Sequence, residues 1–203
     1  MKRAVLASAN AGKLRELAAL LAPAGFELIP QGALAIEPAA ETGATFLENA
    51  LLKARHAARA ARIPALADDS GIEVDALGGR PGVRSARFAG EGASDAANLA
   101  RLMDELSGVP EERRSARYRC VIVWVRGPDD AAPLITRGTW EGRIALAPRG
   151  SGGFGYDPVF VPAGGQRTAA ELPAHEKNAV SHRGKALRAL VAALEAAGVY
   201  SRP

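Results

Sequence analysis

Apolar residues along the chain follow two spacings, which predict strands alternating with helices. Mostly apolar runs at 3–8 and 26–29 are typical of short buried strands. Between them, apolar residues recur every three or four positions after Asn10, which is a suitable N-cap for a helix. The stretch from 45 to 62 repeats this spacing and predicts a core-facing helix, whose apolar stripe is Leu47, Leu51, Ala54, Ala58 and Ala61.

The second half of the chain continues the alternation with longer strands. Ser94 is placed to cap one helix, and Ser181 is placed to cap the last helix. Between these helices, 116–126 and 134–146 are strand candidates separated by a Gly-Pro-Asp-Asp-Ala turn. Long strands joined by a hairpin indicate a broad, partly antiparallel sheet. We therefore predict an α/β fold in a single domain that spans 1–203.

A pair of carboxylates interrupts the apolar pattern near the middle of the first half. The run that begins at Pro64 ends in Asp68 and Asp69, and Ser70 and Gly71 predict a turn before a second alternating run at 72–77. Mg2+ prefers oxygen ligands and is usually held by one or two carboxylates together with substrate phosphates. The stretch is therefore a candidate magnesium site, although Asp, Ser and Gly are equally ordinary turn residues.

Lysines are scarce and fall in the segments that carry candidate chemistry. The chain has 21 Arg and only 5 Lys, and three of the lysines are Lys13, Lys53 and Lys177. Lys13 lies in the first turn of a predicted helix, where the helix dipole disfavours a cation, and His182 and Arg183 begin the last helix in the same way. A bound anion would resolve this conflict. The alternative is an ordinary strand-to-helix connection with a solvated lysine.

Two further polar features add to these candidates. Asn49, Lys53 and His56 line up on one face of the predicted helix, which is an ordinary solvated face unless it borders the carboxylate pair. The glycine-rich stretch 150–158 carries Phe154 and Tyr156, whose flat rings offer faces on which a base can stack. A plain flexible loop is the alternative for this stretch.

The composition narrows the classes of protein to consider. Apolar residues make up 48% and charged residues 24% of the chain, which is typical of a soluble globular protein. No apolar run of about 18 residues and no signal-peptide pattern occurs, so we expect a cytoplasmic protein that is not bound to a membrane. The net charge of +4 permits an anionic partner without requiring nucleic acid. Cys120, the single cysteine, lies in an apolar run and is expected to be a buried thiol.

Together these features describe a nucleoside triphosphate site in which cations and Mg2+ hold phosphates and an aromatic ring holds the base. In the motifs that carry these features, the sequence resembles the inosine/xanthosine triphosphate pyrophosphatases, which remove non-standard purine nucleotides. The resemblance runs from Met1 to about Ala197 and is carried by a series of motifs in the expected order, at 8–13, 41–43, 46–55, 67–71, 79–83, 152–158 and 181–184.

The resemblance implies Mg2+-dependent hydrolysis of ITP, dITP or XTP to the monophosphate and pyrophosphate. It implies a homodimer with a two-lobed α/β fold, a long mixed central sheet and a site in the cleft between the lobes. By the same resemblance, Glu41 and Asp69 hold the metal, Asp69 accepts the proton of the attacking water, and Asp68 is a supporting acid. The substrate contacts that it implies are Ser8, Ala9, Asn10, Ala11, Gly12, Lys13, Lys53, Ser70, Phe154, Gly155, Tyr156, Asp157, Lys177, His182 and Arg183.

These implied roles agree with the chemistry of the reaction. Attack at the α-phosphorus expels pyrophosphate, so negative charge grows on the bridging oxygen, where Mg2+ and lysines stabilise it. Donors on His182 or Arg183 that bind a 6-oxo group would be left unpaired by the 6-amino group of adenine, at a cost of about 1–3 kcal/mol. Two alternatives stay open: a related pyrophosphatase for modified pyrimidine or standard nucleotides, and a nucleotide-sensing or nucleic-acid-binding module without chemistry.

Overall fold

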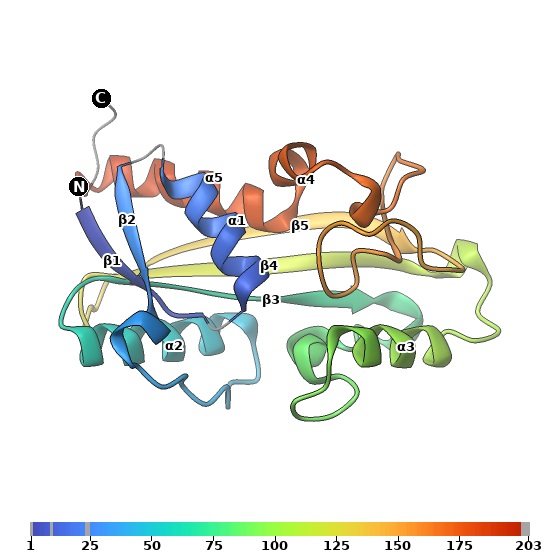
Figure 1. Ribbon diagram of the computed structural model, residues 1–203, viewed down its shortest axis with the longest axis horizontal. Helices are drawn as coiled ribbons and strands as arrows, with labels where there is room; N and C mark the ends of the chain where they lie inside the picture. The colour runs from blue at the N-terminus through green and yellow to red at the C-terminus, as the bar shows by residue number, and fades with distance from the viewer. Residues whose placement is uncertain (1, 9, 23–24, 200–203) are drawn as a thin grey trace. The chain divides into compact units, whose positions relative to one another are not determined.

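A computed structural model of the chain describes residues 2–8, 10–22 and 25–199 and shows an α/β fold built on a mixed sheet (Figure 1). The strand order within these residues is β2-β1-β3-β4-β5-β6. β1 pairs in parallel with β2 and β3, whereas β5 and β6 are antiparallel. The predicted fold class, a mixed sheet flanked by helices, is confirmed. The strands are β1 (Lys2–Leu6), β2 (Phe26–Pro30), β3 (Ala65–Val74), β4 (Ser115–Val125), β5 (Leu134–Ile144) and β6 (Phe160–Pro162).

Two of the helices begin at caps that the sequence predicts. Asn10 Oδ1 accepts the backbone N–H of Lys13 at 3.0 Å, and Ser94 Oγ accepts that of Ala97 at 3.2 Å, so both predicted caps are confirmed. None of the helices in the described ranges is long and apolar enough to cross a membrane. The helices are α1 (Ala11–Leu21), α2 (Phe46–Ala61), α3 (Asp95–Glu105), α4 (Ala174–Val180) and α5 (His182–Ala196).

The chain divides into two compact units. The first contains residues up to Asp69, residues 120–138 and the chain from Arg183 onward. The second contains residues 70–119 and 139–182. Strands β3, β4 and β5 each contribute residues to both units, because the boundaries fall within these strands.

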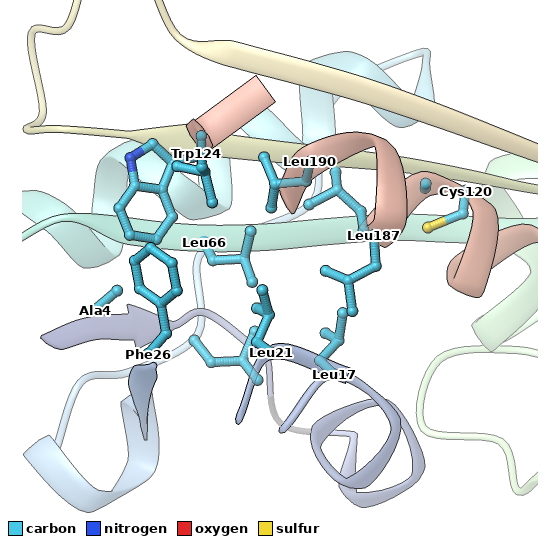
Figure 2. Packing of buried hydrophobic residues seen from close by; sticks show 13 residues of the cluster. Ala4, Leu17, Leu21, Phe26, Leu66, Cys120, Trp124, Leu187 and Leu190 are labelled. Atoms are coloured by element: carbon cyan, nitrogen blue, oxygen red, sulfur yellow. The ribbon is translucent and has the colours of Figure 1, made fainter. Parts of the chain in front are cut away.

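In the first unit, helices cover both faces of the strands. Alternate residues of β1 point to opposite faces, so Leu6 joins one cluster and Val5 another. On the Leu6 face, α1 and α5 pack their leucines around Leu66, and the ring of Phe26 meets that of Trp124 edge-on at 5.3 Å (Figure 2). On the Val5 face, α2 packs small side chains against the valines of β4, namely Ala50, Ala54, Ala57 and Ala58 against Val121, Val123 and Val125.

The second unit has its own hydrophobic core. Leu102 and Leu106 of α3 pack with Ile72 and Val74 of β3, and aromatic rings complete the cluster. The Tyr118 ring meets the Phe160 ring at 4.7 Å between centroids. The loops of the second unit are therefore attached to a packed, largely apolar core.

Two local predictions are wrong. The predicted turn at Ser70 and Gly71 does not form, because β3 runs without interruption from Ala65 to Val74. β3 lies between β1 and β4 in the sheet, and its two carboxylates find cationic partners on other elements, so the strand continues through them. In addition, the alternating run at 72–77 is strand only as far as Val74 and ends in the short 3-10 helix η3 (Asp75–Leu77). A second 3-10 helix, η4 (Gly82–Arg87), follows.

Candidate functional site

Asp69 is the centre of a polar group in the first unit. Lys53 Nζ lies 3.0 Å from Asp69 Oδ1 and 2.7 Å from Glu41 Oε1, so one ammonium group joins the two carboxylates that the sequence predicts as metal ligands. Asn49 Nδ2 donates to Asp69 Oδ2 at 3.3 Å. The polar row on α2 therefore does border the carboxylate pair, except that His56 contacts the Glu37 carbonyl oxygen instead.

Burial and charge set the protonation of this group. Burial alone acts to lower the pKa of Lys53, but the attraction of Asp69, Asp68 and Glu41 outweighs it and raises the pKa, so the ammonium stays charged at neutral pH. The pKa of Asp69 is raised, because burial and the repulsion of Glu41 together exceed the attraction of Lys53 and Lys13. A carboxylate with a raised pKa is a stronger proton acceptor, as a general base requires.

Asn49 fixes the loop that carries Glu41 relative to Asp69. Its side chain is fully buried, and its Oδ1 accepts the Gly43 N–H at 2.8 Å while its Nδ2 reaches Asp69. A Cβ at residue 43 would lie 2.7 Å from Asn49 Oδ1, so this approach requires glycine. Asn49 was visible in the sequence as part of the α2 row, but nothing in the sequence identified this bridging role.

Asp68 has a different environment from its neighbour. Its carboxylate is buried, and Oδ2 lies 3.1 Å from Lys13 Nζ and 3.4 Å from Arg183 Nε. Burial acts to raise its pKa, but the attraction of Lys13, Arg183 and Lys53 is larger and holds the pKa well below the usual range. Asp68 is therefore a permanent anion at neutral pH, which suits a structural counter-charge better than an acid.

Arg183 is also buried and is held by carboxylates of its own unit. Besides Asp68, its guanidinium donates to Glu16 of α1, a residue for which the sequence offered no signal. Burial acts to lower the pKa of Arg183, but the attraction of the Asp68 and Glu16 carboxylates outweighs it and raises the pKa. The role of Arg183 in reading the base stays a prediction, since the contacts described here anchor the start of α5 to α1.

The residues that lead into α1 form a helix N-terminus, and a cation, Lys13, lies in the first turn of this helix. Ser8 Oγ accepts the Asn10 N–H at 3.2 Å, and Ala11, Gly12 and Lys13 form the first turn. The predicted substrate contact Ala9 lies outside the described residues. Lys13 faces Asp68 with its side chain only 15% exposed, so the conflict between this lysine and the helix dipole is relieved by a carboxylate of the protein itself.

The glycine-rich loop of the second unit is organised by Asp157. Its carboxylate accepts the Phe154 N–H at 2.8 Å, the Lys177 ammonium at 2.7 Å and the Tyr118 hydroxyl at 3.3 Å. Lys177 is buried, and its Nζ lies 4.9 Å from the centre of the Phe154 ring. Asp157 and Lys177 thus hold the loop from within, and their contacts with a nucleotide stay predictions.

The aromatic residues of this loop differ in accessibility. Phe154 is partly exposed, whereas Tyr156 is 4% exposed, belongs to the core of the second unit and donates its hydroxyl to the Ser85 carbonyl oxygen at 2.7 Å. The interpretation of Tyr156 as an open stacking face is therefore wrong, because apolar packing takes up the ring. His182, also of the second unit, stacks on Tyr118 with ring centres 4.5 Å apart.

Two other predicted contacts of the second unit belong to its backbone framework. Gly155 N–H donates to Asp95 Oδ2 at 2.9 Å, which fastens the loop to the first turn of α3. Ser70 is partly buried within β3.

Replacement of Gly153 by alanine tests the loop geometry. A Cβ at this position would lie 2.0 Å from Asp157 Oδ2, and φ is +71°, so we expect Gly153→Ala to lower the free energy of unfolding by at least about 2 kcal/mol. Gly155→Ala is the matched control, because φ is +60° but the space is open, and it should cost only about 1 kcal/mol. Urea unfolding of both variants measures the difference, and equal costs would contradict the role given to Asp157.

In the first unit, the predicted metal ligands Glu41 and Asp69 are carboxylates that both contact Lys53. In the described part of the chain, no three His, Cys, Asp or Glu side chains gather in a way that could hold a metal ion by themselves. Cys120 is buried, and burial raises the pKa of its thiol to about 12, so the expectation of an inert structural cysteine is confirmed. A metal bound by Glu41 and Asp69 would therefore need further oxygen ligands from water or substrate.

Comparison with known proteins gives consistent matches over nearly the whole chain. The Ham1 family profile matches residues 4–193. A "dITP/XTP pyrophosphatase" of Methylococcus capsulatus is 59% identical over 96% of this chain and 97% of its own, and one of Escherichia coli K12 is 52% identical over 96% and 98%. The solved structure of a HAM1 protein from Coxiella burnetii, 48% identical, covers 97% of this chain and 100% of its own with a TM-score of 0.88. The resemblance inferred from the sequence motifs is confirmed.

Proposed function

This chain belongs to the Ham1 family, and on that premise we propose that it hydrolyses non-standard purine nucleoside triphosphates, namely ITP, dITP and XTP, to the monophosphate and pyrophosphate. The observation that carries the proposal is the group around Asp69, in which a buried carboxylate with a raised pKa lies beside a charged lysine and a second carboxylate. This arrangement suits proton abstraction from water next to a polyphosphate.

Different residues of the first unit have different roles in such a reaction. Asp69 accepts the proton of the water that attacks the α-phosphorus, and Asn49 keeps its carboxylate in place. Lys53 supplies positive charge to the phosphates, as does Lys13 if it exchanges Asp68 for a phosphate oxygen. Both lysines are held near their places by the carboxylates they contact, which limits the reorganisation needed on substrate binding.

We propose Mg2+ as the cofactor, held by Glu41 and Asp69. The support is the donor set, since two carboxylates that share one ammonium group form an oxygen-rich, negatively charged position. When bound, Mg2+ neutralises phosphate charge and stabilises the pyrophosphate leaving group. Removal of divalent ions with a chelator should abolish turnover and leave the fold intact.

In the second unit, the residues proposed to receive the base are Phe154, by stacking, and His182, by hydrogen bonding. Phe154 has a partly exposed ring, and Lys177 beneath it is fixed by Asp157. Selection of a 6-oxo purine over adenine would follow from donors that adenine leaves unpaired. We also propose a homodimer that acts on the cytoplasmic nucleotide pool, in accordance with the resemblance stated above.

Product analysis with separate nucleotides tests this function. The purified protein with Mg2+ should release pyrophosphate and monophosphate from ITP, dITP and XTP, with at least about 100-fold lower kcat/KM for ATP, since an unpaired buried donor costs about 1–3 kcal/mol and a repelled amino group adds to it. Release of orthophosphate would contradict attack at the α-phosphorus. Equal turnover of ATP or of modified pyrimidine nucleotides would contradict selection of the 6-oxo purine.

A further inference from the structure

The loop that carries Phe154 is fastened to two other elements of the second unit. Its Gly155 N–H donates to Asp95 Oδ2 of α3 at 2.9 Å. Its Tyr156 hydroxyl donates to the Ser85 carbonyl oxygen of η4 at 2.7 Å. Burial raises the pKa of Tyr156, and the negative charge of Asp95 adds to this effect, so the hydroxyl stays protonated and can donate. Two consecutive residues of the loop are therefore held from outside it.

Helix α3 is itself held near both of its ends by buried polar side chains. Near its start, Asn98 accepts the Ala89 N–H at 2.7 Å and donates to the Ala86 carbonyl oxygen at 3.1 Å. Past its end, Arg114 donates to the Leu106 carbonyl oxygen at 2.9 Å. The helix is therefore a rigid support from which a side chain can position a neighbouring loop.

Two carboxylates fix the peptide planes on either side of Phe154. Asp157 Oδ2 accepts the Phe154 N–H at 2.8 Å and so holds the plane before this residue. Asp95 accepts the Gly155 N–H, which lies in one rigid plane with the Phe154 carbonyl group, and so holds the plane after it. Gly155 has a φ of +60°, and a Cβ there would meet open space, so packing does little to restrain this position. The direction in which the Phe154 side chain leaves the backbone therefore depends on both carboxylates.

We propose that Asp95 is a positioning residue for Phe154 and thereby contributes to binding of the substrate's base. This inference rests on the proposed function, in which Phe154 stacks on the purine base. Stacking acts on the ground state and the transition state alike, because the base is remote from the α-phosphorus, so its weakening should raise KM and leave kcat unchanged. Asp95 is exposed and can be replaced without disturbing the core, whereas Asp157 is buried and also binds Lys177.

Replacement of Asp95 tests this role. Asp95→Ala should raise KM for ITP about fivefold at unchanged kcat, because loss of one hydrogen bond typically changes an equilibrium constant by this order. Asp95→Asn should bring KM back to within about twofold of the parent value, since an amide oxygen can accept the same N–H. The competitive inhibition constant of inorganic triphosphate, which has no base, should be equal in the parent and both variants. Steady-state kinetics with ITP and Mg2+ measure these values.

Asp104→Ala is the matched control, because Asp104 is an exposed carboxylate near the other end of α3, and its KM should equal that of the parent. A purely structural role of Asp95 would lower the folded fraction and hence the apparent kcat, while the folded molecules would keep the parent KM. The proposal is overturned if Asp95→Ala keeps the parent KM or if Asp104→Ala raises KM equally. It is also overturned if Asp95→Asn behaves like Asp95→Ala, or if the inhibition constant of inorganic triphosphate rises in parallel with KM.

Binding measured without turnover separates this inference from the proposed function. Equilibrium dialysis with ITP in the absence of divalent ions should give an about fivefold higher Kd for Asp95→Ala, and the Gly155 amide proton should exchange about fivefold faster. If the parent binds ITP without hydrolysing it, the proposed function fails, and the ratio of the Kd values still decides the role of Asp95. Equal Kd values with faster Gly155 exchange would overturn the proposal, because Asp95 would then hold the loop without affecting the base. Absence of ITP binding by the parent would overturn both.

Discussion

Asp69→Asn should reduce kcat for ITP by about 10³-fold, because loss of a positioned general base typically costs a factor of 10²–10⁴. The amide keeps the shape of the carboxylate and can still accept a hydrogen bond from Lys53, so the free energy of unfolding should change little. Substrate affinity at low Mg2+ should fall as well if Asp69 is a metal ligand. Steady-state kinetics over a range of Mg2+ concentrations separate the two effects.

Asp129→Asn provides the control for this experiment. Asp129 is 92% exposed and lies 3.7 Å from Arg59, so its replacement removes one negative charge from the first unit at the surface. Its kcat should match that of the parent protein. Retention of more than about a tenth of the parent kcat by Asp69→Asn would remove Asp69 from the role of general base, because the expected loss is at least about a hundredfold.

Helix starts could be predicted from the sequence because they depend on hydrogen bonds between residues that are close together in the chain. Asn10 and Ser94 each accept a backbone N–H three residues further along, an interaction that any chain segment with these residues can form. The stripe of α2 is similarly local, since helical spacing alone brings Ala54 and Ala58 to one face. Such elements need no knowledge of the rest of the fold.

The course of β3 could not be predicted from local pattern. Asp68 and Asp69, followed by Ser70 and Gly71, lead to a turn prediction because Asp, Ser and Gly are ordinary turn residues. In the structure their charges are balanced by Lys13 and Lys53, which come from α1 and α2. The sequence singled out these lysines by their rarity, but their pairing with the two carboxylates depends on the tertiary fold.

The supporting residues of the site were the hardest to find from the sequence. Glu16 is an ordinary acidic residue on a helix, and its importance arises only because Arg183, from the far end of the chain, reaches it. Tyr156 shows the opposite error, since an aromatic ring in a glycine-rich loop serves equally well as a stacking face or as a core residue. Residue type narrows the possible roles, and burial decides among them.

The two adjacent carboxylates of β3 have opposite pKa shifts for a physical reason. Burial acts to raise the pKa of both carboxylates. For Asp68 the attraction of Lys13, Arg183 and Lys53 exceeds this effect and lowers the pKa. For Asp69 burial and the repulsion of Glu41 exceed the attraction of Lys53 and Lys13, so the pKa is raised. One strand therefore presents, side by side, a fixed anion and a carboxylate whose raised pKa suits proton uptake. The fixed anion lies beside Lys13 and Arg183, so we expect it to contribute to stability.

Asp68→Asn should therefore lower the free energy of unfolding at pH 7 by about 3 kcal/mol, because removal of one partner leaves buried cations uncompensated. Because the folded pKa of Asp68 is depressed, its contribution is complete above the unfolded pKa of about 3.9 and is lost as the pH falls through the folded value. The difference between parent and variant should thus be constant from pH 7 to about 5 and shrink by about 1 kcal/mol near pH 3. Urea unfolding across this range measures it, with Asp129→Asn as the exposed control. A difference that does not shrink in acid would mean that the Asp68 charge is not what stabilises this unit.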